Sequence, residues 1–106
     1  MKYEVIITPA AEADVAEAFA YIRSRSPLNA EKWLRALYDV VDGLAEIRGY
    51  GRAPESDWLD FDLHQKVFKS HRIVYSIDHE RRRVYVHYVR HGARRAVREP
   101  WAEQSD

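Results

Sequence analysis

The 106-residue sequence contains no cysteine, which excludes a disulfide framework and a thiolate metal site. Glycine and proline occur four times each, and there is no internal repeat or low-complexity segment. No apolar run approaches the roughly 20 residues that a membrane-spanning helix needs, and the N-terminus lacks the pattern of a secretory signal. These absences lead us to expect a cytoplasmic protein with no membrane partner.

The composition is that of a folded domain, with 46% hydrophobic and 32% charged residues. A chain of this length is large enough for one core and too small for two. We expect a single domain over residues 1–98 and a flexible C-terminal tail over residues 99–106.

Charge is distributed unevenly, although the formal net charge is zero. Residues 63–98 contain ten Lys and Arg against two acids, whereas residues 1–62 contain seven bases and twelve acids. The basic part also has the alternation typical of consecutive strands, so its charge should lie on one sheet. Such a basic sheet favours an anionic partner. Uneven but ordinary surface charge is the simpler alternative.

The hydrophobic pattern predicts the element order β-α-α-β-β-β, an α+β domain. Thr8-Pro9 and Ser26-Pro27 each provide an N-cap followed by proline at the first helical position. The two helices, of which the second should run from residue 27 to about 48, form an αα-hairpin on one face of a mainly antiparallel four-stranded sheet. We expect the strands at residues 3–7, 63–68, 72–78 and 84–91.

Alternation along the strands predicts which side chains face the helices. The helix-covered face should be Leu63, Val67, Ile73, Tyr75, Ile77, Val84, Val86 and Tyr88. The open face should then carry cations, imidazoles and rings that suit an RNA or protein partner, namely His64, Lys66, Phe68, Arg72, Val74, Ser76, Tyr85, His87, Val89 and His91.

We expect no metal and no cofactor. His87 and His91 are four residues apart in a strand, about 13 Å, too far for both to ligate one zinc ion. The sequence also contains no glycine-rich phosphate loop, no serine elbow and no HExxH motif.

Three segments of the chain form a recognisable series in their order and spacing, namely residues 30–33 (AEKW), 71–78 (HRIVYSID) and 89–95 (VRHGARR). In these segments the sequence resembles the RelE/ParE superfamily of type II toxin–antitoxin toxins, also called plasmid stabilisation proteins. The resemblance implies two helices packed on an antiparallel sheet, and a cognate antitoxin as partner. It also implies one of two targets, since ParE-like members inhibit DNA gyrase and RelE-like members cut mRNA on the ribosome without a metal.

The resemblance implies tentative roles for four residues if the chain is a nuclease. Arg72 and Arg94 match the positions of two catalytic arginines, and Lys66 lies near that of a catalytic lysine. His91 is the candidate acid or base, because an imidazole has a pKa near neutrality. A surface ion pair is the plainer role for Arg72, and a strand-end imidazole for His91.

Three functions therefore remain open at this stage. A ParE-like inhibitor of a target such as gyrase is favoured slightly, because the tyrosine that RelE-like nucleases have near the C-terminus is missing and the pI is near 7. The second is a RelE-like endoribonuclease, and the third is a non-toxic partner-binding module. In each case we expect the partner surface to include Arg94 and Arg95 beside the cations, imidazoles and rings of the open face.

Overall fold

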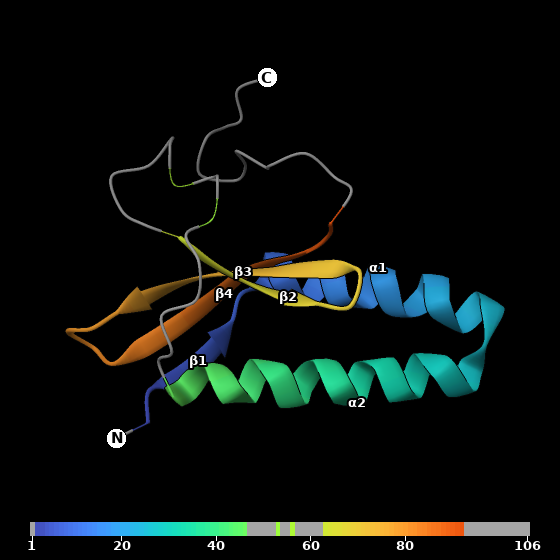
Figure 1. Cartoon of the computed structure of the whole chain (residues 1–106), viewed down its shortest axis with the longest axis horizontal. Coiled ribbons are helices and arrows are strands. Elements are labelled where there is room, and N and C mark those ends of the chain that lie inside the picture. Colours follow the sequence, from blue (N-terminus) through green and yellow to red (C-terminus); the bar gives the residue numbers. More distant parts are fainter. Residues whose placement is uncertain (1, 47–52, 54–55, 57–62, 93–106) are drawn as a thin grey trace.

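The computed structural model describes residues 2–46, 53, 56 and 63–92. The predicted order of elements is confirmed (Figure 1). It comprises strand β1 (Glu4–Ile7), helices α1 (Pro9–Arg25) and α2 (Pro27–Gly43), a short 3₁₀ helix η1 (Leu44–Glu46), and strands β2 (His64–Phe68), β3 (His71–Asp78) and β4 (Arg83–His91).

Both predicted helix starts are present. The Thr8 hydroxyl accepts a hydrogen bond from Ala11 N at 3.2 Å, and the Ser26 hydroxyl accepts one from Asn29 N at the same distance. Each cap satisfies an amide that would otherwise lack a partner in the first helical turn. The second helix ends earlier than predicted, at Gly43, because glycine is a weak helix former and the chain tightens into η1.

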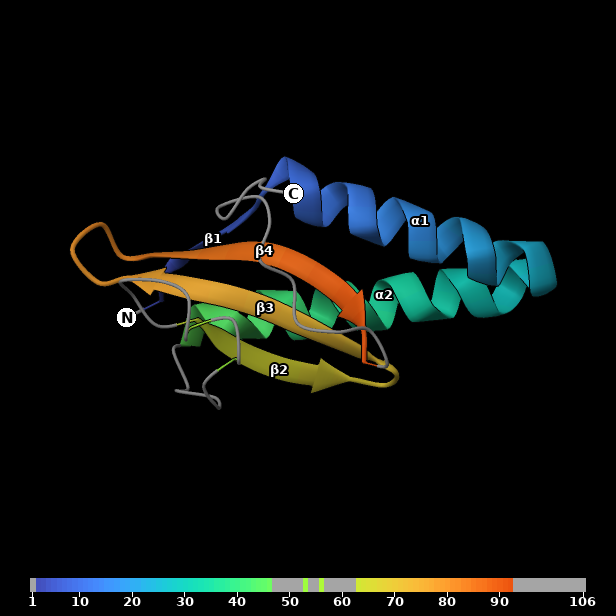
Figure 2. The same ribbon diagram turned by 90° about the horizontal axis from the view of Figure 1, so that it is seen from above.

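The sheet has the strand order β1-β4-β3-β2, so the first strand of the chain pairs with the last. That pair is parallel, whereas β4–β3 and β3–β2 are antiparallel. Thr8 joins strand to helix at this point, because its amide and its hydroxyl both donate to Val86 O, at 3.0 and 2.9 Å. In both views the helical hairpin projects beyond the β2–β3 turn (Figures 1 and 2).

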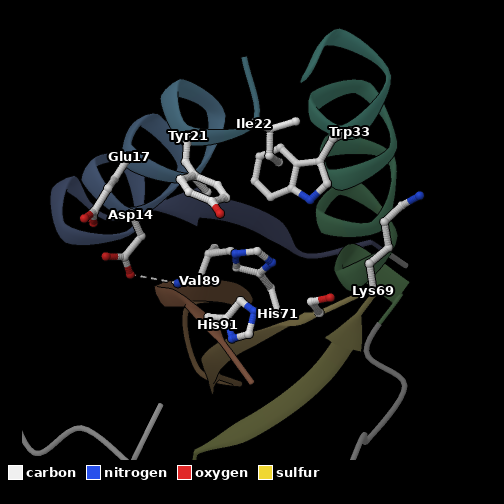
Figure 3. Close-up of a pocket in the computed structure, with 11 residues that line it drawn as sticks. Asp14, Glu17, Tyr21, Ile22, Trp33, Lys69, His71, Val89 and His91 are labelled. Atoms are coloured by element: carbon white, nitrogen blue, oxygen red, sulfur yellow. Dashed lines mark hydrogen bonds between the residues drawn. The ribbon is translucent and has the colours of Figure 1, made fainter. Parts of the chain in front are cut away.

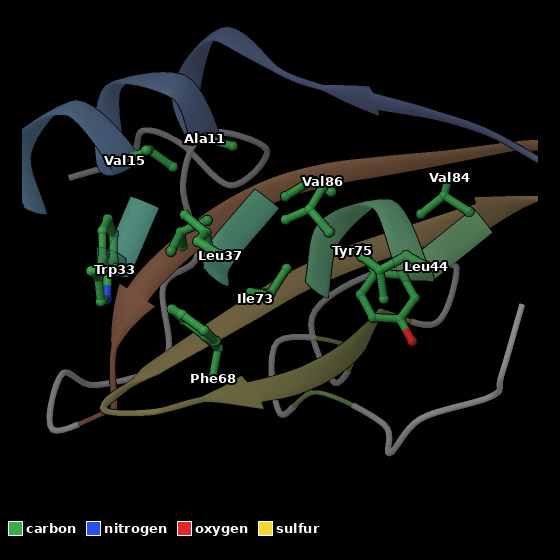
Figure 4. Packing of buried hydrophobic residues seen from close by; sticks show 12 residues of the cluster. Ala11, Val15, Trp33, Leu37, Leu44, Phe68, Ile73, Tyr75, Val84 and Val86 are labelled. Atoms are coloured by element: carbon green, nitrogen blue, oxygen red, sulfur yellow. The ribbon is translucent and has the colours of Figure 1, made fainter. Parts of the chain in front are cut away.

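The core lies between the hairpin and one face of the sheet (Figure 4). Its helix side consists of Ala11 and Val15 from α1 and Trp33, Leu37 and Val41 from α2. The sheet contributes Phe68, Ile73, Tyr75, Val84, Val86 and Val89.

The predicted faces of β2 are wrong. Phe68 is 6% exposed and packs against Trp33, with ring centroids 6.0 Å apart, whereas Val67 is 63% exposed. His64 and Lys66 lie on the helix side with Phe68, because they are paired with the core residues Tyr75 and Ile73. The strand places its largest ring under the hairpin, and alternation then turns Leu63 and Val67 to the other face.

Two neighbouring residues of β2 test this orientation. Phe68→Ala should lower the free energy of unfolding by about 3–5 kcal/mol, because it leaves a cavity beneath Trp33. Val67→Ala, the matched control, should change it by about 0.5 kcal/mol or less, since that side chain is mostly in solvent. Urea unfolding of both variants measures the difference, and equal losses would contradict the assignment.

Candidate functional site

A register shift in the β3–β4 pair determines where the candidate residues point. Tyr75 is paired with Val86 and Val74 with Tyr88, so His87 is an extra residue in β4, a β-bulge. Beyond the bulge the alternation of β4 is inverted. Val89 therefore lies in the core rather than on the open face, and Tyr88 lies on the face opposite the hairpin.

The same inversion separates two of the predicted catalytic residues. Arg72 is paired with Arg90, and His91 is paired with His71, the residue that precedes Arg72. Since successive side chains point to opposite faces, Arg72 and His91 project from opposite sides of the sheet. Arg72 Nη1 donates to Gln65 Oε1 at 2.9 Å, on the face away from the helices. The expectation that Arg72 and His91 share one surface is therefore wrong.

The remaining predicted residues are also dispersed. Lys66 lies on the helix side of β2, an outer strand of the sheet, so it does not join Arg72. Tyr85 and His87 do lie on the face away from the helices, with their rings stacked at 6.4 Å. Arg94 and Arg95 fall outside the described residues, as does the tail at residues 99–106.

The face expected to be open is partly covered. Leu63, Val74 and Tyr88 are almost fully buried there and pack with Ala53. Hydrogen bonds hold these residues in place, because Ala53 N donates to Leu63 O at 2.8 Å and Leu63 N donates to the Ser56 hydroxyl at 2.7 Å. This small second core removes much of the surface that was predicted for RNA or a protein partner.

His87 lies beside this second core. Its Nε2 is 2.8 Å from the Ser76 hydroxyl, and burial lowers its pKa below the usual value of about 6.5. The imidazole therefore favours its neutral form in the folded protein, which suits a structural role in the bulge.

A pocket of about 490 Å³ opens on the hairpin side, where β4 ends beside the β2–β3 turn (Figure 3). Helix α1 forms one wall, Trp33 of α2 another, and the turn and the end of β4 a third. Its lining residues are Asp14, Glu17, Ala18, Tyr21, Ile22, Trp33, Lys69, Ser70, His71, Val89 and His91.

Two imidazoles meet in this pocket. The rings of His71 and His91 are 5.4 Å apart and nearly perpendicular, and Figure 3 shows them beneath Tyr21. Lys69 lies in the turn with a positive φ of 53°, a conformation that costs a non-glycine residue about 1–2 kcal/mol. Two groups that can exchange protons and one ammonium thus share a concave site.

Sequence reasoning missed His71 because it assigned the residue to a turn. His71 is the first residue of β3 and directly opposes His91, which only the strand register reveals. The two-residue turn at Lys69 and Ser70 could have suggested this pairing, since it fixes which residues are opposite.

Asp14 holds the α1 wall of the pocket against β4. Its Oδ2 accepts a hydrogen bond from Val89 N at 2.9 Å and lies 3.4 Å from Arg90 Nε. Both side chains of this ion pair are largely buried, at 11% and 20% exposure. The carboxylate therefore satisfies a strand amide and offsets a cation at once.

The described part of the chain contains no group of three or more metal-ligating residues suited to a metal ion. Within the same residues, no helix is long and apolar enough to cross a membrane.

Comparison with known proteins assigns the family. The model of the ParE toxin of the type II toxin–antitoxin system parDE matches residues 5–96. The chain belongs to the ParE toxin family. No curated protein matches it. One chain of the crystal structure of the toxin–antitoxin complex RelBE2 from Mycobacterium tuberculosis is similar in fold, with a TM-score of 0.50 and 16% identity, over 86% of this chain and 99% of that one.

The family match confirms the resemblance to type II toxins, and the structural match confirms the fold predicted for them. This member of the ParE toxin family therefore consists of a helical hairpin packed on a four-stranded sheet, with a pocket at one end.

The depressed pKa of His87 predicts a pH dependence of stability. In the unfolded state the His87 imidazole binds a proton near pH 6.5, whereas in the folded state it binds one only at lower pH. The contribution of His87 to the free energy of unfolding should therefore be fully present above pH 6.5 and decrease as the pH drops below this value. The urea midpoint should therefore decrease between pH 7.5 and 5.5. His87→Gln should flatten this slope, whereas His79→Gln, at an exposed position, should leave it unchanged. A wild-type slope retained in His87→Gln would contradict the assignment.

Proposed function

We propose that this chain is the toxin of a type II module and acts by binding a protein target, with DNA gyrase as the candidate, rather than by cutting RNA. The observation that carries the proposal is the separation of Arg72 and His91 on opposite faces. Cleavage by the ribose 2′-OH needs an acid, a base and phosphate-binding cations around a single phosphate. The match to the ParE toxin model supports the same choice.

A binding mechanism also agrees with the shape of the molecule. The projecting hairpin and the pocket beside it offer an apolar, partly aromatic surface, including Tyr21 at 62% exposure. Exposed aromatic side chains next to a concave site are typical of protein–protein contacts. A cognate antitoxin would be the partner that silences the toxin.

Induced expression without an antitoxin should arrest growth, and the purified protein should inhibit gyrase supercoiling while transcripts in arrested cells stay intact. A dose-dependent supercoiling assay and primer extension on mRNA from the same induction measure both. Cleaved transcripts with normal supercoiling would overturn the gyrase proposal. Normal growth at high yield of folded protein would favour the non-toxic partner-binding module.

A second function, metal-independent mRNA cleavage on the ribosome, is favoured by the pocket alone. There His71 and His91 could act as base and acid, and Lys69, which lines the same pocket, could stabilise phosphate charge. This set replaces the tentative group of Arg72, Arg94, Lys66 and His91. Of the three members that the structure describes, His91 lines the pocket, whereas Arg72 and Lys66 do not.

If the second function holds, His71→Ala and His91→Ala should each reduce codon-dependent cuts by about 100-fold or more, the usual contribution of a general acid or base. His79→Ala is the matched control, because that exposed imidazole lies at the other end of β3. Primer extension after matched induction gives the readout. Undiminished cutting in both pocket variants would exclude the two histidines from the chemistry.

A further inference from the structure

The pocket combines an apolar floor with a polar rim. Ala18, Ile22, Trp33 and Val89 supply apolar surface, Lys69 and the two imidazoles lie on the sheet side, and Glu17 lies on the α1 side. On the opposite wall the Asp14 carboxylate is already engaged by Val89 N and Arg90. Such a site suits a large apolar side chain flanked by carboxylates.

The chain itself contains a segment with a large aromatic side chain among carboxylates. Residues 99–106 contain Trp101 and three acids, Glu99, Glu103 and Asp106, with no base. The match to the ParE toxin model ends at residue 96, so this segment lies beyond the part shared with the family model. Its carboxylates are opposite in charge to the Lys69 ammonium in the pocket lining.

The described part of the chain ends at the pocket. His91 lines the cavity, and Gly92 N donates to Ser70 O at 2.6 Å, which holds the end of β4 against the β2–β3 turn. A Cβ on Gly92 would lie 3.3 Å from the same carbonyl oxygen, so glycine permits this close approach. Nine residues lie between His91 and Trp101, so the ten Cα–Cα steps can span up to about 33 Å.

We propose that residues 99–106 dock in cis into this pocket, with the Trp101 indole on the apolar floor and the carboxylates toward Lys69, His71 and His91. A short tether gives such a segment an effective concentration on the order of millimolar, so weak contacts suffice. The docked segment would compete with any protein partner that uses the pocket. This inference goes beyond the proposed function and does not depend on the identity of the target.

The absence of cysteine allows a direct test in the full chain. A nitroxide attached to Ser105→Cys should broaden the amide signals of pocket residues such as Ala18, His71 and Val89 in a ¹⁵N spectrum. Signals of Leu63 and Val74, on the other face of the sheet, should keep their intensity. Adding Trp101→Ala should restore the pocket signals.

Filling the pocket provides the matched control. Ala18→Leu occupies the cavity and should abolish the broadening, whereas Ala20→Leu, at an exposed position of the same helix, should retain it. Thermal unfolding of each variant shows that it is folded. Broadening that survives Ala18→Leu or Trp101→Ala, that falls on the opposite face, or that is absent from wild type would overturn the proposal.

A mixed sample distinguishes the chain's own segment from that of a second copy. ¹⁵N protein without a nitroxide is combined with nitroxide-bearing protein of natural isotope abundance. Docking in cis predicts no broadening in this mixture, and broadening of the pocket signals there would assign the occupant to another molecule. Since neither readout involves toxicity, failure here and failure of the growth test are separate results.

Discussion

One extra residue in the last strand determines what each face of this sheet can do. His87 is the extra residue in the register between β3 and β4, and the alternation of side chains is inverted beyond it. Val89 is thereby directed into the core, and His91 is placed beside His71. With regular pairing, the end of β4 would present the opposite set of side chains to the hairpin, and the pocket would lose an imidazole and part of its apolar floor.

The pocket is held open by contacts between elements far apart in the sequence. Asp14 of α1 binds the backbone of β4 and the guanidinium of Arg90, while Arg90 also lies over the Tyr88 ring at 4.5 Å. This largely buried arrangement connects the hairpin wall of the pocket to the second core on the other face. Removing one partner of such a mostly desolvated ion pair should destabilise the protein, because the remaining charge would be left buried. The position of α1 is therefore tied to the register of β4.

Features that depend on local sequence signals were predicted correctly, whereas features that depend on tertiary contacts were not. Both helices, their caps and the four strands followed from periodicity and from Thr8 and Ser26. The face of β2 did not, because apolar residues occur at both parities of that strand and the choice is made by Phe68 packing on Trp33. The β-bulge could not be predicted from the sequence of β4 either. That strand has apolar residues that are acceptable on both faces, namely Val84, Val86, Tyr88 and Val89. For that reason the sequence grouped Arg72 with His91, which the strand register separates.

The parallel pairing of β1 with β4 has a consequence for when the protein can become active. Thr8 reaches across 78 positions to Val86, and among the described strands β1 pairs with β4 alone. Contacts so distant in sequence form late, after the intervening chain has been closed into a loop. A nascent polypeptide therefore cannot complete the sheet, or the pocket beside it, until residues 83–91 have been translated. Any partner that needs the finished pocket can bind only after that point in synthesis.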